Sequence, residues 1–495
     1  MRRRSALKTN CKFVARSAAL LGLLLLGACT TLDSADDLQA AVSGEAPVSF
    51  ESQRAKDPQA KLGAKQHPKI LAAHGGAFKS PAMERLLAPV AGALVSSSGD
   101  NARAYDITVL DSPQVNAFAL PGGYLYVTRG LLALANDEAE VAAVLAHEIA
   151  HVTSNHGIER REQAQANEVA ERVVNDVVSN EVAGKLARVR VSNRMASFSQ
   201  TQELQADAVG IKLLGKAGYD PFASARFLEN MERYTSWRSA SNNSGDDMSS
   251  SHPSTPQRVE LARRHARAIG PVGTGKRNGK RYLRGLDGLV YGDTANEGYV
   301  RGQRFSHVKL GITFEVPEPF ELVNQSTAVL ASAPGERALR FDAVASNGRV
   351  DPVAYLKSGW VNGLQAASVR PLSIDGQPAA FGRAIAGDWQ FAVTVIAKEG
   401  RMFRFILAVP KSQPDISALG AQIAGSFRRL TDAQKAALKP LKVRVVETKP
   451  GDTVNSLARR MKGVSKPELL FRALNGLSPN ERITAGTLVK IISDS

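Results

Sequence analysis

The sequence predicts a multidomain α+β protein, and three observations support this. The chain has 495 residues, which exceeds the usual size of a single hydrophobic core. Apolar residues make up 43% and charged residues 22%, which are ordinary globular values that exclude wholesale disorder and a polytopic membrane protein. Helical and strand-like apolar spacing also alternate in blocks along the chain. We therefore expect a mainly helical domain with a small β-sheet, a middle α+β domain and a small βααβ domain.

The first residues are typical of a targeting segment. Six basic residues precede the apolar run 18–26, which is too short to span a bilayer, so residues 1–28 are predicted to be a signal peptide. Leu26-Gly27-Ala28-Cys29 resembles the bacterial lipobox, which implies cleavage before Cys29 and lipidation of its thiol. The alternatives are an uncleaved anchor or an ordinary signal with an incidental cysteine. Residues 29–61, rich in Ala, Ser, Asp and Gln, suit a flexible tether.

The cysteine content and the net charge indicate where in the cell the protein works. Of the two cysteines, Cys11 would leave with the signal peptide and Cys29 would be lipidated, so no disulfide is expected. Loss of residues 1–28 lowers the formal charge from +16 to +10, which favours anionic envelope surfaces and does not indicate nucleic acid. We expect a periplasm-facing lipoprotein of the cell envelope. Thr30 after Cys29, instead of aspartate, favours the outer membrane.

Residues 62–267 form the first predicted domain, which is mainly helical. Two short strands are expected at 105–110 and 124–128, around the turn Pro121-Gly122-Gly123. Asn136 and Asp137 are suited to cap a helix that runs to about Asn155. The other helices of this domain are expected at 83–95, 159–190, 200–217 and 221–238.

The rest of the chain divides into a linker and two domains. Residues 268–300 are Gly-rich and basic, which predicts a linker. The glycines at 270–275 are not a phosphate-binding loop, because Arg277 stands where Ser or Thr should bind magnesium. Alternating runs predict an α+β domain at 301–430, for which no role is apparent. A helical connector at 432–438 leads to a compact domain at 442–492.

A zinc-binding pattern lies inside the helix predicted after Asp137. His147 and His151 are four residues apart, so both imidazoles lie on one face of the helix. The adjacent Glu148 can take a proton from a zinc-bound water and pass it to the leaving amine. The alternative, a helix with ordinary core or solvated histidines, is weakened by a suitable third ligand, Glu203. Asp207 shares a helix face with Glu203 and can orient a ligand histidine.

At these residues the chain resembles the HtpX and CAAX-prenyl-protease family of gluzincin metalloproteases, in its soluble periplasmic form. The resemblance implies one Zn²⁺ per chain, held by His147, His151 and Glu203. It further implies that Asn116, Ala117, Phe118 and Ala119 form a strand edge that holds an extended peptide.

The resemblance extends to a later His-Pro segment. His252 and Arg258 match family positions that imply steadying of the oxyanion or gating of the zinc. The alternative for His252 is a loop histidine before a proline. His156, near the end of the motif helix, is given no role beyond local assistance.

Residues 442–492 resemble a LysM module. The resemblance implies binding to N-acetylglucosamine polymers such as peptidoglycan. The alternative is a degenerate copy used for packing, because no binding aromatic residue stands out.

These features together predict a zinc-dependent endopeptidase of the cell envelope that acts on polypeptides. The family resemblance implies cleavage of misfolded or misassembled envelope proteins. An alternative function is a peptidoglycan-binding scaffold or chaperone with little proteolytic activity, and cleavage of peptidoglycan itself ranks third.

Overall fold

The computed structural model describes residues 60–99, 105–160, 162, 181–241, 248–346, 351–414 and 416–494. These residues belong to one compact unit, Lys56–Ser495. The predicted signal peptide, the lipidation site Cys29 and nearly all of the predicted tether lie outside the described residues. The described part of the chain contains no helix that is both long and apolar enough to cross a membrane.

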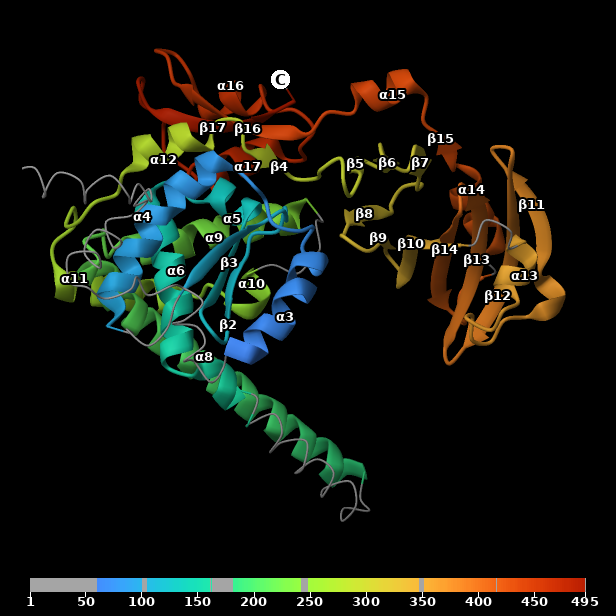
Figure 1. Ribbon diagram of the computed structural model, residues 1–495, viewed down its shortest axis with the longest axis horizontal. Coiled ribbons are helices and arrows are strands. Elements are labelled where there is room, and N and C mark those ends of the chain that lie inside the picture. Colours follow the sequence, from blue (N-terminus) through green and yellow to red (C-terminus); the bar gives the residue numbers. More distant parts are fainter. Residues whose placement is uncertain are drawn as a thin grey trace, which may run out of the picture. The chain divides into compact units, whose positions relative to one another are not determined.

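The first part of the structure is mainly helical (Figure 1). Helix α6, which carries the zinc-binding pattern, begins after Asp137, whose carboxylate accepts a hydrogen bond from the Glu140 N–H at 2.8 Å. It ends before Asn155, which has a positive φ of 57° and turns the chain. The helices of this part are α3 (Ala60–Ala73), α4 (Pro81–Ser98), α5 (Arg129–Leu134), α6 (Glu138–Thr153), α8 (Glu181–Lys216), α9 (Ala223–Ala240), α10 (Met248–Ser251), α11 (Pro256–Ile269) and α12 (Gly279–Leu286).

A three-stranded sheet lies against α6. Strand β3 (Tyr124–Thr128) is central, with β1 (Asp106–Leu110) parallel on one side and β2 (Ala117–Leu120) antiparallel on the other. Strand β2 packs against α6. Its outer edge has no strand partner among the described residues. The sheet therefore presents one open strand edge on the side where β2 meets the zinc-pattern helix.

The middle part consists of two antiparallel sheets that share a core. A seven-stranded sheet has the order β11-β12-β13-β14-β10-β9-β8, and a four-stranded sheet has the order β15-β7-β6-β5. Aromatic side chains join the two sheets; the rings of Phe314 and Phe341 lie 4.6 Å apart. The elements are β5 (Tyr299–Arg301), β6 (Arg304–His307), β7 (Ile312–Glu315), β8 (Glu321–Asn324), β9 (Val329–Ala333), β10 (Arg337–Ala345), α13 (Pro352–Leu356), η1 (Ala366–Ser368), β11 (Arg370–Ile374), β12 (Gln377–Ala386), β13 (Trp389–Lys398), β14 (Arg401–Pro410), α14 (Ser417–Gly425) and β15 (Arg428–Arg429).

The last part has the βααβ order expected from the sequence. After α15 (Asp432–Ala437) it comprises β16 (Leu441–Glu447), α16 (Val454–Ala458), α17 (Pro467–Leu474) and β17 (Leu488–Ser493). Strand β16 also pairs with β4 (Val290–Tyr291). The mixed α and β class is therefore confirmed, whereas the likeness of this part to a LysM module stays a prediction.

This last part shares a hydrophobic core with the helical part. Buried residues of β16, α16, α17 and β17 belong to the same cluster as those of α4, α5, α6 and α9. The indole N–H of Trp237 on α9 donates to the Ser465 carbonyl at 3.0 Å. The ammonium of Lys490, which is fully buried on β17, donates to three carbonyls at the end of α5: Ala133, Leu134 and Ala135, at 2.8, 2.9 and 2.7 Å. Residues 442–492 are thus packed into the structure that carries α6.

The segment expected as a linker, 268–300, contains helix α12 and strand β4. Tyr282 on α12 is fully buried, and its hydroxyl donates to the Leu132 carbonyl at 2.7 Å. Arg277 donates to Asp137 at 2.7 Å. Basic residues of this segment therefore contact the acidic N-terminus of α6, where a cation neutralises a buried carboxylate. The Gly-rich composition concealed these contacts.

Candidate active site

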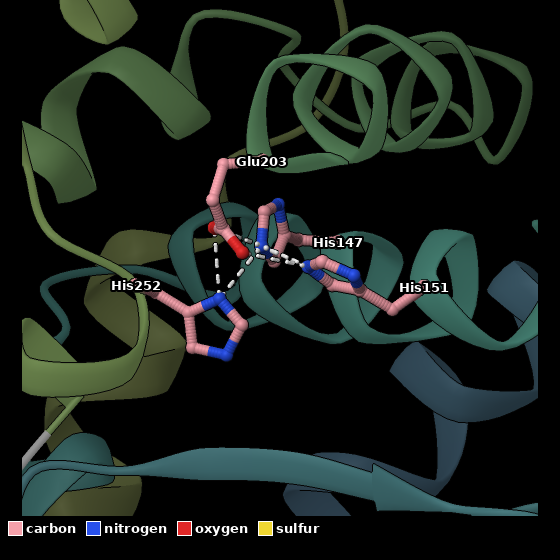
Figure 2. A group of neighbouring side chains, drawn as sticks. All are labelled: His147, His151, Glu203 and His252. Atoms are coloured by element: carbon pink, nitrogen blue, oxygen red, sulfur yellow. Dashed lines mark hydrogen bonds and ion pairs between the residues drawn. The ribbon is translucent and has the colours of Figure 1, made fainter. Parts of the chain in front are cut away.

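Four buried side chains converge on one point between α6 and α8 (Figure 2). His147 and His151 project from α6, Glu203 from α8, and His252 from the segment that follows α10. Their donor atoms all lie within 4.8 Å of one another. The sequence-predicted ligands His147, His151 and Glu203 are thus together, and His252 is beside them.

The spacing of the donor atoms suits a tetrahedral metal ion. The Nε2 atoms of His147 and His151 lie 3.0 Å apart, and each lies 3.3 Å from an oxygen of Glu203. The Nδ1 atom of His252 lies 3.3 Å from His147 Nε2 and 2.8 Å from Glu203 Oε2. Zinc bonds of about 2.0–2.1 Å in tetrahedral geometry put neighbouring donors roughly 3.3 Å apart. Three imidazoles and one carboxylate therefore fit Zn²⁺.

Asp207 and Arg258 support the ligands from behind. Asp207 Oδ1 lies 3.0 Å from His147 Nδ1, so it can accept the proton of that ring and leave Nε2 for the metal. Arg258 donates to both oxygens of Asp207 at 2.8 Å and lies 3.2 Å from Glu203 Oε2. Burial alone would raise the pKa of Asp207, but the contacts with Arg258 and His147 lower it to about 2. Arg258 therefore binds both the ligand carboxylate of Glu203 and the carboxylate of Asp207, which orients His147.

A second supporting group follows the end of α6. His156 Nδ1 lies 2.9 Å from His151 Nδ1, and Arg160 lies 3.2 Å from Glu203 Oε1. The turn at Asn155 brings both residues back toward the ligands. Sequence reasoning left His156 without a definite role and missed Arg160. The five-residue spacing from His151 to His156 was the only signal available.

Glu148 is positioned as a proton acceptor. It is 3% exposed, and its Oε1 has no hydrogen-bond partner among the described residues. His252 Nε2 lies 3.8 Å from this oxygen. Burial raises the pKa of Glu148, and the nearby histidines oppose that rise. A buried carboxylate with a free oxygen and a raised pKa is suited to accept a proton.

Strand β2, whose outer edge is open, packs against the helix that carries His147 and His151. The Thr128 N–H donates to the Asn116 carbonyl at 3.0 Å, so these two residues are a hydrogen-bonded pair. Because such pairs alternate along antiparallel strands, Ala117 and Ala119 direct their N–H and C=O groups to the open edge. Phe118 packs on Tyr126, with ring centroids 4.9 Å apart. The buried Oδ1 of Asn116 has no partner among the described residues.

Comparison with known proteins agrees with this geometry. A family model described as "Peptidase family M48" matches residues 81–266. The matched residues contain the whole His-His-Glu-His cluster, so this part of the chain is similar to the peptidases of family M48. The match supports the prediction of a zinc metalloendopeptidase, and the buried cluster is able to bind one zinc ion, as predicted.

Individual relatives include "Mitochondrial metalloendopeptidase OMA1" of Schizosaccharomyces pombe, 31% identical over 169 residues, which cover 34% of this chain and 48% of that protein. "Beta-barrel assembly-enhancing protease" of Yersinia pestis is 28% identical over 203 residues, covering 39% and 40% of the two chains. The protease of the same name from Escherichia coli (strain K12) is 28% identical over 193 residues, covering 36% and 38%. The aligned residues span less than half the length of each relative.

Proposed function

We propose that this protein is a zinc-dependent endopeptidase of the cell envelope in which Glu148 is the general base. The observation that carries the proposal is the cluster of His147, His151 and Glu203 beside the free, buried Oε1 of Glu148. When bound, zinc lowers the pKa of a water molecule to roughly 7 and polarises the scissile carbonyl. Glu148 takes the proton of the attacking water and delivers it to the leaving amine.

The other residues of the site orient the zinc ligands or bind the substrate. Asp207 holds His147 in the tautomer that presents Nε2, and His156 lies where it can do the same for His151. The open edge of β2 pairs with an extended polypeptide through the backbone of Ala117 and Ala119. Such pairing uses no side chain of the substrate, which suits a protease that acts on many unfolded chains.

His252 holds the site in a latent state. A catalytic zinc site has three protein ligands and one position for water, but here a fourth protein donor is within reach. With zinc bound, His252 Nδ1 would be the fourth donor in place of the attacking water. We propose that His252 withdraws when a substrate enters. The expected gating role is thus preferred over direct stabilisation of the oxyanion.

The cellular setting rests on sequence and on relatives. Some relatives are named beta-barrel assembly-enhancing proteases, and we propose that misfolded or misassembled envelope proteins are the substrates here. Lipidation of Cys29 would hold the protein at a membrane, and the outer membrane is the expected one. Residues 442–492 would bind peptidoglycan. Support for the last role is limited to the sequence pattern and the βααβ order.

The first experiment compares purified full-length protein with Glu148→Gln in degradation of unfolded β-casein, with zinc content measured in both. We expect cleavage by the parent and at least a 100-fold slower rate for the zinc-loaded variant. Zinc-loaded protein that never cuts, even as His252→Ala, would instead favour the scaffold or chaperone function. Parent protein without zinc would refute the proposal.

Separate measurements test the proposed lipid anchor and the proposed binding to peptidoglycan. Mass spectrometry of the mature N-terminus should find a diacylglyceryl group on Cys29, and Cys29→Ala should move the protein out of the membrane fraction. Insoluble peptidoglycan should retain the protein in a sedimentation assay. An unmodified N-terminus or unretained protein would each remove the corresponding part of the proposal.

A further inference from the structure

A small cavity lies directly beside the metal ligands. It is lined by α6, α8, α9, α11 and the segment Met248–His252, and its volume is about 30 Å³, which is room for about two water molecules. Its polar wall includes the ligand His147. Its apolar wall consists of Val144 on α6, Phe227, Leu228 and Met231 on α9, and Met248.

The charged groups that line this cavity already have partners. Arg258 and Asp207 make two hydrogen bonds to each other, both of 2.8 Å. The cavity therefore offers no spare counter-ion to an incoming charged side chain, and burial of such a charge is unfavourable. An aliphatic side chain meets no such obstacle.

Met248 makes a contact expected of a bound peptide. Its N–H donates to the Val115 carbonyl at 2.8 Å. Val115, Ala117 and Ala119 are alternate residues, so their backbone groups point to the same side of the strand. The Val115 carbonyl therefore continues the open edge of β2. Met248 thus pairs with the edge that we assign to substrate, while its side chain, 5% exposed, lines the cavity.

The turn from Met248 to His252 makes the contacts that a bound substrate peptide would make. The His252 N–H donates to the Met248 carbonyl at 2.7 Å, so one helical turn joins the two residues and places them on the same side. The turn supplies a backbone bond to the β2 edge, an apolar side chain to the cavity and a donor atom to the metal cluster. A peptide bound for cleavage would supply the same three groups, with its scissile carbonyl at the metal.

We infer that this cavity, together with the adjoining space that the Met248 side chain fills, is the specificity pocket of the peptidase, and that Met248 stands there in place of a substrate side chain. The inference rests on the proposed endopeptidase function and names its preference. The pocket takes leucine or methionine at one of the two positions that flank the scissile bond. Alanine fills it poorly, tryptophan exceeds it, and aspartate or lysine would be buried without a counter-ion.

The test maps the cleavage sites of the full-length protein in unfolded β-casein by mass spectrometry. Rates are then measured on quenched peptides that differ only at the preferred position. We expect leucine and methionine to be cleaved at least ~10-fold faster than alanine or aspartate, within the 10–200-fold range typical of apolar pockets. Met231→Phe, which narrows the pocket, should shift preference toward alanine. Phe227→Ala should admit phenylalanine.

A separate experiment tests whether the Met248 side chain fills the specificity pocket. Met248→Ala should raise the cleavage rate of the leucine peptide several-fold, because the competing side chain is gone. Ser251→Ala, an exposed position on the same turn, is the matched control and should leave the rate unchanged. An unchanged rate in Met248→Ala would overturn the occupation.

Failure of the pocket and failure of the proposed function give different results. Cleavage without a positional preference, or a preference that Met231→Phe does not alter in zinc-loaded protein, would refute the pocket and leave the peptidase intact. No cleavage of any peptide by zinc-loaded parent, His252→Ala and Met248→Ala would refute the endopeptidase itself.

Discussion

Replacement of Lys490 by methionine should destabilise the peptidase domain, although Lys490 lies in the sequence some 340 residues after the zinc-pattern helix. The ammonium is fully buried and donates to the carbonyls of Ala133, Leu134 and Ala135. These are the last carbonyls of α5 and its C-cap, which have no partner within the helix. Methionine matches the length of lysine but donates no hydrogen bond.

The cost follows from the number of acceptors that lose their donor. All three carbonyls lose the ammonium. The Leu134 carbonyl keeps the Asn230 side-chain amide at 3.1 Å, whereas those of Ala133 and Ala135 keep no side-chain donor among the described residues. A buried polar group left without its partner costs about 1–3 kcal/mol, which gives roughly 2–6 kcal/mol for two. We therefore expect a loss of about 4 kcal/mol.

Urea unfolding, followed by the fluorescence of Trp237, measures this cost. Trp237 bonds to Ser465, so its emission reports on the docking of residues 442–492. The other two tryptophans, at 360 and 389, are first replaced by phenylalanine in all variants. Lys449→Met, at an exposed position of the same part, is the control and should change the free energy of unfolding by less than about 0.5 kcal/mol. If the free energy of unfolding of Lys490→Met lies within about 1 kcal/mol of the parent value, the buried ammonium does not hold residues 442–492 against the helical part.

Three further predictions concern the metal site. His252→Ala should speed casein cleavage about 10-fold if the His252 contact is favoured over water by about 1.4 kcal/mol; a slower rate at full zinc content would show instead that His252 acts on the substrate. Asp207→Asn should weaken zinc binding about 10- to 100-fold in competition with a chromophoric chelator, since it withdraws the acceptor from His147; unchanged affinity would contradict this role. Removal of zinc by a chelator should lower the melting temperature measured by calorimetry, because a ligand at about 1,000 times its Kd contributes roughly 4 kcal/mol; identical melting of apo and zinc-loaded protein would argue against a bound ion.

Local periodicity made much of the metal site predictable. His147 and His151 are one helical turn apart, as are Glu203 and Asp207, so spacing alone places each pair on one face. Which helices then meet is a tertiary property, and the family resemblance supplied it. The position of His252 among the ligands depends on a turn that begins at Met248, and no periodic signal marks that turn.

Alternation likewise predicted the strands of the middle part but not their order. Alternating runs predicted strands within residues 301–430, where β7 and β10 now lie. The order of the seven-stranded sheet reflects pairings between distant segments, which local pattern does not encode. Lys490 was missed for a different reason: lysine is rarely buried, so nothing in its neighbourhood distinguished it from a solvated residue.

The contact between Lys490 and the end of α5 joins residues 355 to 357 positions apart. During synthesis or export from the N-terminus, α6 emerges long before β17, with the whole middle part between them. Contacts of such long separation form late, because the loop that they close must first be ordered. A nascent chain would therefore carry the zinc ligands without the strand that completes their supporting core. The order of emergence would itself delay a finished peptidase until the middle part has cleared the point of exit.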